Sequence, residues 1–412
     1  MTIYRDMIVR RESCRICGAS LGRELITFDA LPVSGAYVSP QDPPPDPVFP
    51  LSLIQCSACG LAQLRESVTP SFYSRYCFMS GVAAGYMNYL GHFAKHISDT
   101  LEQGTRVLEI GCSDGSLLEL LRNAGFKVAG FEPATGPALA AQNKSLAVAN
   151  EFFNVNSASR CGFERADLII IRHVLEHIDD FLPIFAGIDH LAEPDATLVI
   201  EVPDLASTVK HAIFSNIYHI HPCYFDVRTL SDLLARYGWQ AVGSTTVDIF
   251  GGSLLVWAQR KGMAKRPAFS FREVTRQPAR IVNSSELYSF VLTWKETAQK
   301  AREFFDRLRN RGAHIAGYGA AERTASMIGA SGLDASHVSV IFDRNPHLDG
   351  RMLPGSRIPI LHPSAIAAHK PEYLVIFAQS FEDEIIHQQN SFHDAGGRFI
   401  SLKSGVPRIL GD

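Results

Sequence analysis

Short apolar runs alternate with helical patterns through the middle of the chain, from about residue 71 to residue 258. The clearest runs are residues 106–110, 127–131, 167–171 and 197–200. Strand-length apolar runs that alternate with amphipathic helices are typical of a doubly wound parallel sheet. We therefore predict an α/β fold for this region.

A long amphipathic segment follows, in which apolar residues recur at helical spacing from Leu287 to Leu308. Asn283 and Glu286 have the spacing of a capping box, which predicts where this helix begins. Beyond it, residues 314–319, 338–343 and 373–377 begin a second series of strands and helices. We expect a second Rossmann-like α/β domain there.

Composition narrows the class of protein. The chain has 412 residues, a formal net charge of −3 and 46% hydrophobic residues. This length predicts two or three domains, and the charge balance argues against nucleic acid or a membrane surface as a partner. Arginines interrupt the N-terminal stretch, and no later stretch reaches the roughly 18 apolar residues of a membrane span. We therefore expect a cytoplasmic protein.

Residues 1–70 are rich in proline and turn residues and contain too few apolar positions for an unaided core. They carry the pairs Cys14-x-x-Cys17 and Cys56-x-x-Cys59, each followed by glycine. Two such knuckles can direct four thiolates at one tetrahedral Zn²⁺, which would be structural because no coordination position stays open. Chance pairs or a redox dithiol are the alternatives, although a redox motif does not need duplication.

A glycine loop follows the first apolar run, where a backbone can approach a ligand closely. The second run ends about 20 residues further on at an acid that can accept hydrogen bonds from ribose hydroxyls. This arrangement alone fits NAD or S-adenosylmethionine (SAM), but the spacing E-x-G-x-x-x-G differs from the glycine pattern of pyrophosphate sites. The residues concerned are Glu109, Gly111, Ser113, Asp114, Gly115, Glu132 and Pro133.

Histidines and tyrosines cluster in residues 217–225, with Arg172–His177 earlier in the chain. Imidazole titrates near neutrality and phenol donates a strong hydrogen bond, so such a cluster can abstract a proton and stabilise an enolate. An isolated histidine is more often structural. The candidate catalytic residues in this cluster are Tyr218, His221 and Tyr224.

The two CxxC pairs, the EIGCSDGSLL loop with FEP, and the YHIHPCYF block together resemble the three-domain SAM-dependent sugar C-methyltransferases. That family methylates carbon 3 of nucleotide-linked 4-keto-deoxysugars, with thymidine diphosphate as the nucleotide. The likeness spans essentially the whole chain. It implies a zinc-binding domain at 1–70, a SAM-dependent methyltransferase domain at 71–258 and a substrate-binding Rossmann-like domain at 259–412.

The resemblance also implies roles for single residues. His221 would be the general base at carbon 3, while Tyr218 and Tyr76 would lie near the sugar and His177 would line the same pocket. His173 would extend the SAM site beyond the glycine loop toward the methionine end of the cofactor, and Asp167 toward the adenine end. We expect a monomer or a weak dimer.

This sequence departs from the family pattern at functional positions. Ile220 stands where the family has a carboxylate, Phe250 where it has histidine and Phe78 where it has a second tyrosine. Losing a general acid or base typically costs about 10²–10⁴-fold in rate. Three hypotheses follow: C-methylation of a keto-sugar nucleotide, altered chemistry such as O- or N-methylation or a rearrangement, and a binding module without turnover.

Overall fold

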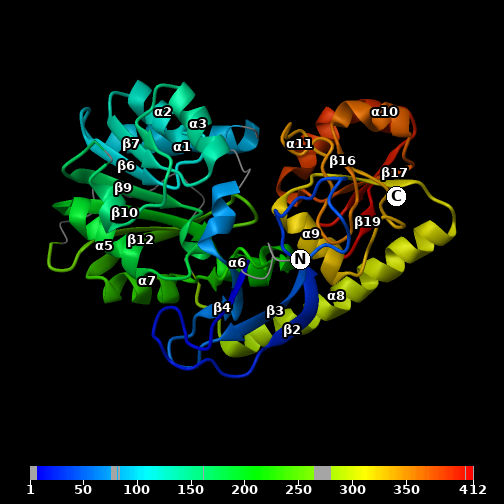
Figure 1. The fold of residues 1–412 in the computed structure, drawn as a ribbon, viewed down its shortest axis with the longest axis horizontal. Helices are drawn as coiled ribbons and strands as arrows, with labels where there is room; N and C mark the ends of the chain where they lie inside the picture. Colours follow the sequence, from blue (N-terminus) through cyan, green and yellow to red (C-terminus); the bar gives the residue numbers. More distant parts are fainter. Residues whose placement is uncertain are drawn as a thin grey trace.

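The computed structural model describes residues 7–75, 81, 84–160, 162–263, 280–403 and 405–411. Two α/β domains lie side by side, and the N-terminal strands and a long helix lie beneath them in the view of Figure 1. No helix among the described residues is long and apolar enough to cross a membrane.

The N-terminal region is built from short strands. A four-stranded sheet has the order β11-β4-β3-β2, and a separate two-stranded sheet pairs β1 with β5. The strand β11 comes from the predicted catalytic block, so this sheet joins segments far apart in the chain. The elements are β1 (Ile8–Arg10), β2 (Ile26–Pro32), β3 (Val48–Gln55), β4 (Ala62–Leu64), β5 (Glu66–Val68), η1 (Pro70–Arg75) and β11 (Cys223–Tyr224).

The central domain contains a seven-stranded sheet with the order β12-β13-β10-β9-β6-β7-β8. The strands from β6 to β10 run parallel, and β13 pairs antiparallel with β10 and with β12. The sheet strands are β6 (Arg106–Ile110), β7 (Lys127–Phe131), β8 (Val148–Ala149), β9 (Ala166–Arg172), β10 (Ala192–Pro203), β12 (Trp239–Val247) and β13 (Ser253–Arg260). The predicted parallel α/β sheet is confirmed. Its strand order reverses at β6, with β7 and β8 on one side and β9 and β10 on the other.

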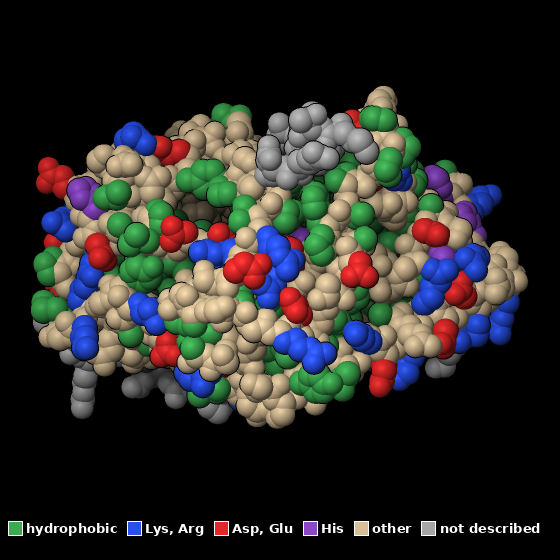
Figure 2. Space-filling view, turned by 60° about the horizontal axis from the view of Figure 1, so that its bottom comes forward, with side chains coloured by type: hydrophobic (Ala, Val, Ile, Leu, Met, Phe, Trp, Pro, Cys, Tyr) green, Lys and Arg blue, Asp and Glu red, His purple; other side chains and the backbone are tan. Residues whose placement is uncertain are grey.

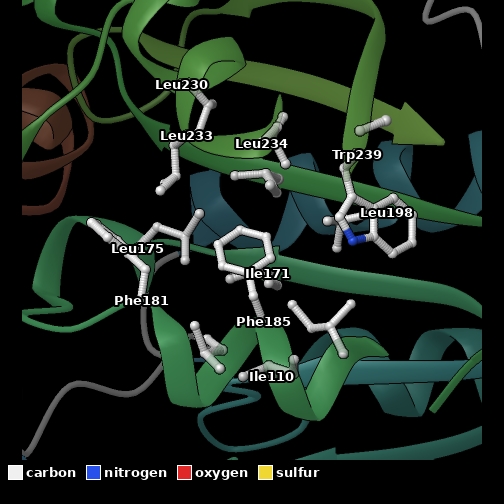
Figure 3. Close-up of a cluster of buried hydrophobic side chains, with 14 of the residues drawn as sticks. Ile110, Ile171, Leu175, Phe181, Phe185, Leu198, Leu230, Leu233, Leu234 and Trp239 are labelled. Carbon is white, nitrogen blue, oxygen red and sulfur yellow. The ribbon is translucent and has the colours of Figure 1, made fainter. Parts of the chain in front are cut away.

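Side chains of the central strands alternate between two buried layers. Ile169 and Ile171 of β9 pack with the α5 and α7 side of the domain, while Leu168 and Ile170 pack with α1 and α2. Figure 3 shows the first layer, in which Phe185 of α5 lies against Ile171. The helices are α1 (Ala84–Thr100), α2 (Ser116–Asn123), α3 (Thr135–Asn143), α4 (Val155–Ala158), η3 (Leu175–His177), α5 (Leu182–Leu191), α6 (Leu205–Lys210), η4 (Phe214–Asn216) and α7 (Val227–Arg236).

A single helix of 27 residues, α8 (Ser284–Asn310), connects the N-terminal sheet to the last domain. It begins at the predicted capping box, in which the Asn283 side chain accepts from Glu286 N–H and the Glu286 carboxylate accepts from Asn283 N–H. Its first half packs with the N-terminal sheet through Leu287 and Trp294. Its second half packs with the C-terminal domain through Phe305 and Leu308.

The C-terminal domain is the predicted second α/β unit. Its six-stranded sheet has the order β16-β15-β14-β17-β18-β19, and only β19 is antiparallel to its neighbour. The elements are β14 (Ile315–Tyr318), α9 (Glu322–Ala330), β15 (Ile341–Phe342), β16 (Ile360–Leu361), η5 (Pro363–Ala365), α10 (Ile366–His369), β17 (Tyr373–Ile376), η6 (Gln379–Phe381), α11 (Glu382–Gln388), α12 (Asn390–Asp394), β18 (Arg398–Ser401) and β19 (Arg408–Ile409).

The surface carries charges of both signs. Figure 2 shows Lys and Arg side chains interspersed with Asp and Glu side chains on one face of the molecule. This mixed pattern agrees with the small net charge of −3.

Candidate active site and zinc centre

The four N-terminal cysteines lie together. Their sulfur atoms are all within 4.8 Å of one another, and the pairs Cys14–Cys59 and Cys17–Cys56 have Sγ–Sγ distances of 3.5 Å. Tetrahedral zinc with bonds of about 2.3 Å separates its sulfur ligands by about 3.8 Å, so the cluster fits this ion. A side chain also supports the cluster, because Gln63 Nε2 donates to Cys14 Sγ over 3.1 Å.

The second knuckle leads directly into the sheet that contains β11, which is part of the predicted catalytic block (residues 217–225). β4 follows Cys59, and Gln63 of β4 pairs with Cys223 of β11. The Leu64 N–H donates to the Pro222 carbonyl over 2.9 Å. The zinc knuckle and the segment around His221 are therefore joined by backbone hydrogen bonds.

A cavity of about 690 Å³ lies between the two α/β domains. The carboxyl ends of β6, β7 and β9 line it from one side, and the loops after β14, β15 and β17 line it from the other. Ligands of doubly wound sheets bind at this edge. Of the predicted residues, those that line the cavity are Glu109, Gly111, Ser113, Glu132, Pro133, His173, His177, Tyr218 and His221.

The glycine loop has the conformation that its sequence requires. Gly111 has a φ of 74°, and a Cβ there would lie 2.3 Å from Val174 Cγ2. Ser113 adopts φ 50°, which is rare for a residue with a side chain, and its N–H donates to the Glu132 carboxylate over 2.9 Å. The Ala134 N–H donates to the other Glu132 oxygen over 2.8 Å. The loop and the acid after β7 thus form one hydrogen-bonded unit at the cavity wall.

Buried charges lie beneath this loop. Glu109 is 2% exposed, and burial raises the pKa of its carboxyl to about 7 against the effect of Arg172. Glu109 Oε2 has no hydrogen-bond partner among the residues that the structure describes. A buried carboxylate oxygen requires a donor, so a cationic or N–H group of a ligand fits this position. The loop, Glu132 and Glu109 Oε2 together suit an adenosyl cofactor that carries an ammonium group.

His173 lies at the end of β9 with a φ of 52°. Its Nδ1 is 3.4 Å from Glu176 Oε1, and its Nε2 is 3.4 Å from Glu201 Oε1. Burial opposes a charge on this ring, but the two carboxylates raise its pKa to about 9. His173 is therefore a cation at neutral pH and lines the cavity between the two glutamates.

The predicted catalytic histidine is bonded to a predicted catalytic tyrosine. His221 Nε2 lies 2.8 Å from Tyr218 Oη, and the His221 ring also hydrogen-bonds to the backbone of Asn216. Burial, His177 and Arg323 hold the pKa of His221 well below its usual value of 6.5. The imidazole is therefore neutral at pH 7 and can accept a proton.

His177 packs against this pair. Its ring centroid is 4.7 Å from that of His221, in an edge-on arrangement, and its Nδ1 lies 2.6 Å from the Ile220 carbonyl oxygen. Tyr73 of η1 donates to the same carbonyl over 3.0 Å and also lines the cavity. Burial and His173 lower the pKa of His177 against the opposite effects of Glu176 and of the bond to Ile220.

Several predicted residues do not line the cavity. Tyr224 is 4% exposed and packs in the core with the N-terminal sheet and α8. The Asp114 carboxylate accepts from Ser116 and Gly81, and Gly115 is the N-cap residue of α2. Asp167 stands at the amino end of β9, at the opposite edge of the sheet, and pairs with Arg106 at 2.7 Å. Tyr76 and Phe78 lie outside the described residues.

Other cavity residues were not among the predicted site residues. Tyr73, Glu176 and Arg323 line the cavity, and Arg323 comes from α9 of the C-terminal domain. Glu176 adjoins His177 in the chain, and this acid–histidine pair after a buried strand could have drawn attention. Tyr73 and Arg323 lie on segments whose approach to the cavity depends on how the domains pack.

Comparison with known proteins agrees with the three domains. Residues 14–72 match the family model of a zinc-binding domain, residues 84–243 that of a methyltransferase domain, and residues 248–402 that of a C-methyltransferase C-terminal domain. The chain is 28% identical to the C-methyltransferase NovU of Streptomyces niveus over 98% of both chains.

Two further similarities each cover less than half of the chain. A ubiquinone biosynthesis O-methyltransferase of Actinobacillus pleuropneumoniae serotype 5b is 32% identical over 23% of this chain and 44% of that protein. A solved SAM-dependent methyltransferase from Archaeoglobus fulgidus has a TM-score of 0.36 and 17% identity, covering 42% of this chain and 94% of that chain.

The fold, the glycine loop with its acid, and these matches define a SAM-dependent methyltransferase. The consecutive matches to a zinc-binding domain, a methyltransferase domain and a C-methyltransferase C-terminal domain narrow the class of methyltransferase. The chain is thus similar, along nearly its whole length, to a C-methyltransferase, and it combines a zinc-binding match at its N-terminus with a C-methyltransferase C-terminal match.

Proposed function

We propose that the chain transfers a methyl group from SAM to carbon 3 of a nucleotide-linked 4-keto-deoxysugar, with thymidine diphosphate as the nucleotide. The observation that carries this proposal is the pair formed by His221 and Tyr218 at the wall of a cavity of about 690 Å³. Ligand pockets usually range from about 300 to 1,000 Å³. The full-length similarity to NovU, which is named a C-methyltransferase, supports the reaction class.

In this reaction His221 takes the proton from the carbon beside the ketone. Its Nε2 faces the Tyr218 hydroxyl at 2.8 Å, and in the tautomer that accepts from this hydroxyl Nε2 carries the electron pair. The electron pair of the broken C–H bond delocalises onto the ketone oxygen as an enolate. When SAM is bound, it supplies an electrophilic methyl group, and the new C–C bond forms as the S–CH₃ bond breaks.

Tyr218 stabilises the enolate in this proposal. Its hydroxyl contacts His221 Nε2, and catalytic hydrogen bonds often rearrange once a substrate binds. When carbon 3 of the sugar lies next to His221 Nε2, the Tyr218 hydroxyl turns its hydrogen toward the ketone oxygen. A donor aimed at developing negative charge is worth about 10²–10³-fold in rate.

The C-terminal domain holds the nucleotide in this proposal. The loops after β14 and β15 line the cavity, and Arg323 at the start of α9 adds a guanidinium there. An arginine in a partly desolvated cavity is suited to a diphosphate, because its planar fork can contact two oxygens. The sugar would then extend from this side toward His221.

Two experiments test the proposal. Incubation with a panel of TDP-4-keto-deoxysugars and SAM labelled with ¹³C in its methyl group should give a product whose labelled methyl is bonded to carbon, seen by NMR. Without SAM and in D₂O, His221 should exchange the proton at carbon 3 for deuterium. If no sugar of the panel gains a methyl and none exchanges, the proposal is wrong.

Heteroatom methylation is a second candidate, and Ile220 favours it. This residue is fully buried with Val33, Val68 and Tyr218, where the family pattern has a carboxylate. Phe250 packs edge-on to His173 at 5.2 Å in place of a family histidine. A hydroxyl or amine attacks the methyl group with its own lone pair and becomes strongly acidic as it does so, so it needs less help from a base than a C–H bond does. A labelled O–CH₃ or N–CH₃ signal would select this candidate.

A further inference from the structure

Three metal-binding side chains converge at the cavity wall beside the proposed base. Glu176, His177 and His221 each offer one ligand atom, and these atoms all lie within 4.8 Å of one another. All three side chains line the cavity. Glu176 and His177 come from η3, and His221 comes from the block that precedes β11, so the fold brings together two distant segments.

Backbone contacts orient both imidazoles as metal ligands. A carbonyl oxygen can only accept, so the 2.6 Å contact with Ile220 O places a hydrogen on His177 Nδ1 and leaves Nε2 as the ligand atom. The His221 ring also hydrogen-bonds to the backbone, at Asn216, and its Nε2 lies 2.8 Å from the Tyr218 hydroxyl, from which it can accept with its electron pair. Metal-binding histidines in proteins nearly always donate their other ring N–H in this way.

The buried carboxylate of Glu176 gives independent support for a cation at this place. The residue is 1% exposed, and its Oε1 lies 3.4 Å from His173 Nδ1. Its Oε2 is buried and has no hydrogen-bond partner among the residues that the structure describes. A buried carboxylate oxygen without a donor costs free energy unless a cation or a donor meets it.

We propose that Glu176, His177 and His221 form a second metal site, which binds a divalent first-row transition ion such as Zn²⁺, Co²⁺ or Ni²⁺. Two imidazoles and one carboxylate suit ions of this borderline class. Tetrahedral bonds of about 2.0–2.2 Å would place the donors about 3.3–3.6 Å apart. The donors, which now lie within 4.8 Å of one another, can reach these distances by small side-chain movements. Unlike the four-cysteine centre, three protein ligands leave a coordination position open toward the cavity.

This site has a consequence that rests on the proposed function. The ion takes the electron pair of His221 Nε2, which is the pair that removes the substrate proton, so metal binding and proton abstraction exclude each other. Tyr218 must also leave Nε2, from which its hydroxyl lies 2.8 Å. A free transition ion should therefore inhibit methylation competitively with the sugar nucleotide.

The test uses the full chain with zinc in its cysteine centre and titrates it with Co²⁺. Metal analysis should find one further equivalent, and its visible d–d absorption should lack the thiolate-to-cobalt charge transfer of a cysteine site. Glu176→Gln and His177→Asn should each weaken this binding at least 10-fold. His211→Asn changes an exposed histidine outside the cavity and should bind Co²⁺ like the unaltered chain.

Each outcome decides the matter. Variants count only if they keep the structural zinc and a cooperative thermal transition, and His221→Asn provides a third ligand change if one variant fails to fold. The inference is wrong if no further cobalt binds, or if these ligand changes leave its affinity unaltered. If cobalt binds as expected but no keto-sugar nucleotide is methylated or exchanged, the proposed function fails and the metal site stands.

Discussion

His221 Nε2 lies 2.8 Å from Tyr218 Oη, and the His221 N–H donates to the Tyr218 carbonyl over 2.9 Å. A tight turn of the backbone thus fixes the two side chains against each other. The proposed base and the proposed enolate donor are therefore arranged as a pair by the chain itself.

Replacing His221 with asparagine should lower kcat by about 10²–10⁴-fold, because the reaction loses its general base. Tyr218→Phe should lower kcat by about 10²–10³-fold through loss of the enolate donor. Steady-state methylation of a keto-sugar nucleotide measures both effects. His219→Gln is the matched control, because His219 is buried outside the cavity and contacts the Pro50 carbonyl at 3.0 Å. It should lower the Tm and leave the kcat of the folded enzyme within about twofold. A larger loss in this control would contradict the assignment of His221.

The rate of SAM-independent deuterium exchange should stay constant down to pH 6.5 and fall only at more acid pH. Burial, His177 and Arg323 hold the pKa of His221 below its usual 6.5, so the neutral base persists. Arg323→Met removes a positive charge that disfavours the imidazolium, so the pKa of His221 should rise and the acid limb should move to higher pH. Arg344→Met changes an arginine of the same domain that does not line the cavity, and its pH profile should match that of the parent. An unshifted acid limb in Arg323→Met would argue against His221 as the titrating group.

Glu132→Ala should weaken SAM binding about 10–100-fold, measured by calorimetry. The change leaves the Ser113 and Ala134 N–H groups without their acceptor and removes the carboxylate from the cavity wall. Each buried donor left unsatisfied costs about 1–3 kcal/mol. Glu119→Gln on the exposed side of α2 should bind SAM normally. Equal affinities in the two variants would exclude Glu132 from the cofactor site.

Removing the structural zinc should reduce methylation more than SAM binding. Chelation or Cys56→Ser breaks the cysteine centre, and the disturbance reaches the catalytic block through the pairing of β4 with β11. The glycine loop belongs to a different sheet, so SAM affinity should persist. Metal content, kcat and SAM affinity are measured together, with Ser57→Ala in the same knuckle as the control. If kcat persists in protein shown to lack zinc, the coupling is wrong.

Local sequence was enough to predict much of this fold. The apolar runs around Leu108 and Ile169 form parallel strands, and α8 begins at the Asn283 capping box. The four N-terminal cysteines lie together, as their spacing predicts. These features depend on residues that are close together in the chain, or on the tetrahedral geometry that zinc imposes on its four cysteine ligands. The sequence spacing could also place Glu132 beside the glycine loop, since parallel strands end at one edge.

Orientation across segments could not be predicted in the same way. Tyr224 belongs to the catalytic block, yet strand alternation turns it into the core beside α8. Asp167 was expected near the cofactor, although the amino end of β9 lies at the edge opposite the cavity. Arg323 reaches the cavity only because two domains pack together, and no local pattern encodes that contact.

The helix α8 has 27 residues, and at about 1.5 Å per residue it is about 40 Å long. Its two halves are anchored in different cores, through Trp294 at one end and Phe305 at the other. It therefore acts as a stiff spacer, which sets how far the C-terminal domain stands from the zinc-bearing sheet. A tilt of this spacer, or local rearrangement at the rim, would then be the means by which the proposed sugar nucleotide enters the cavity.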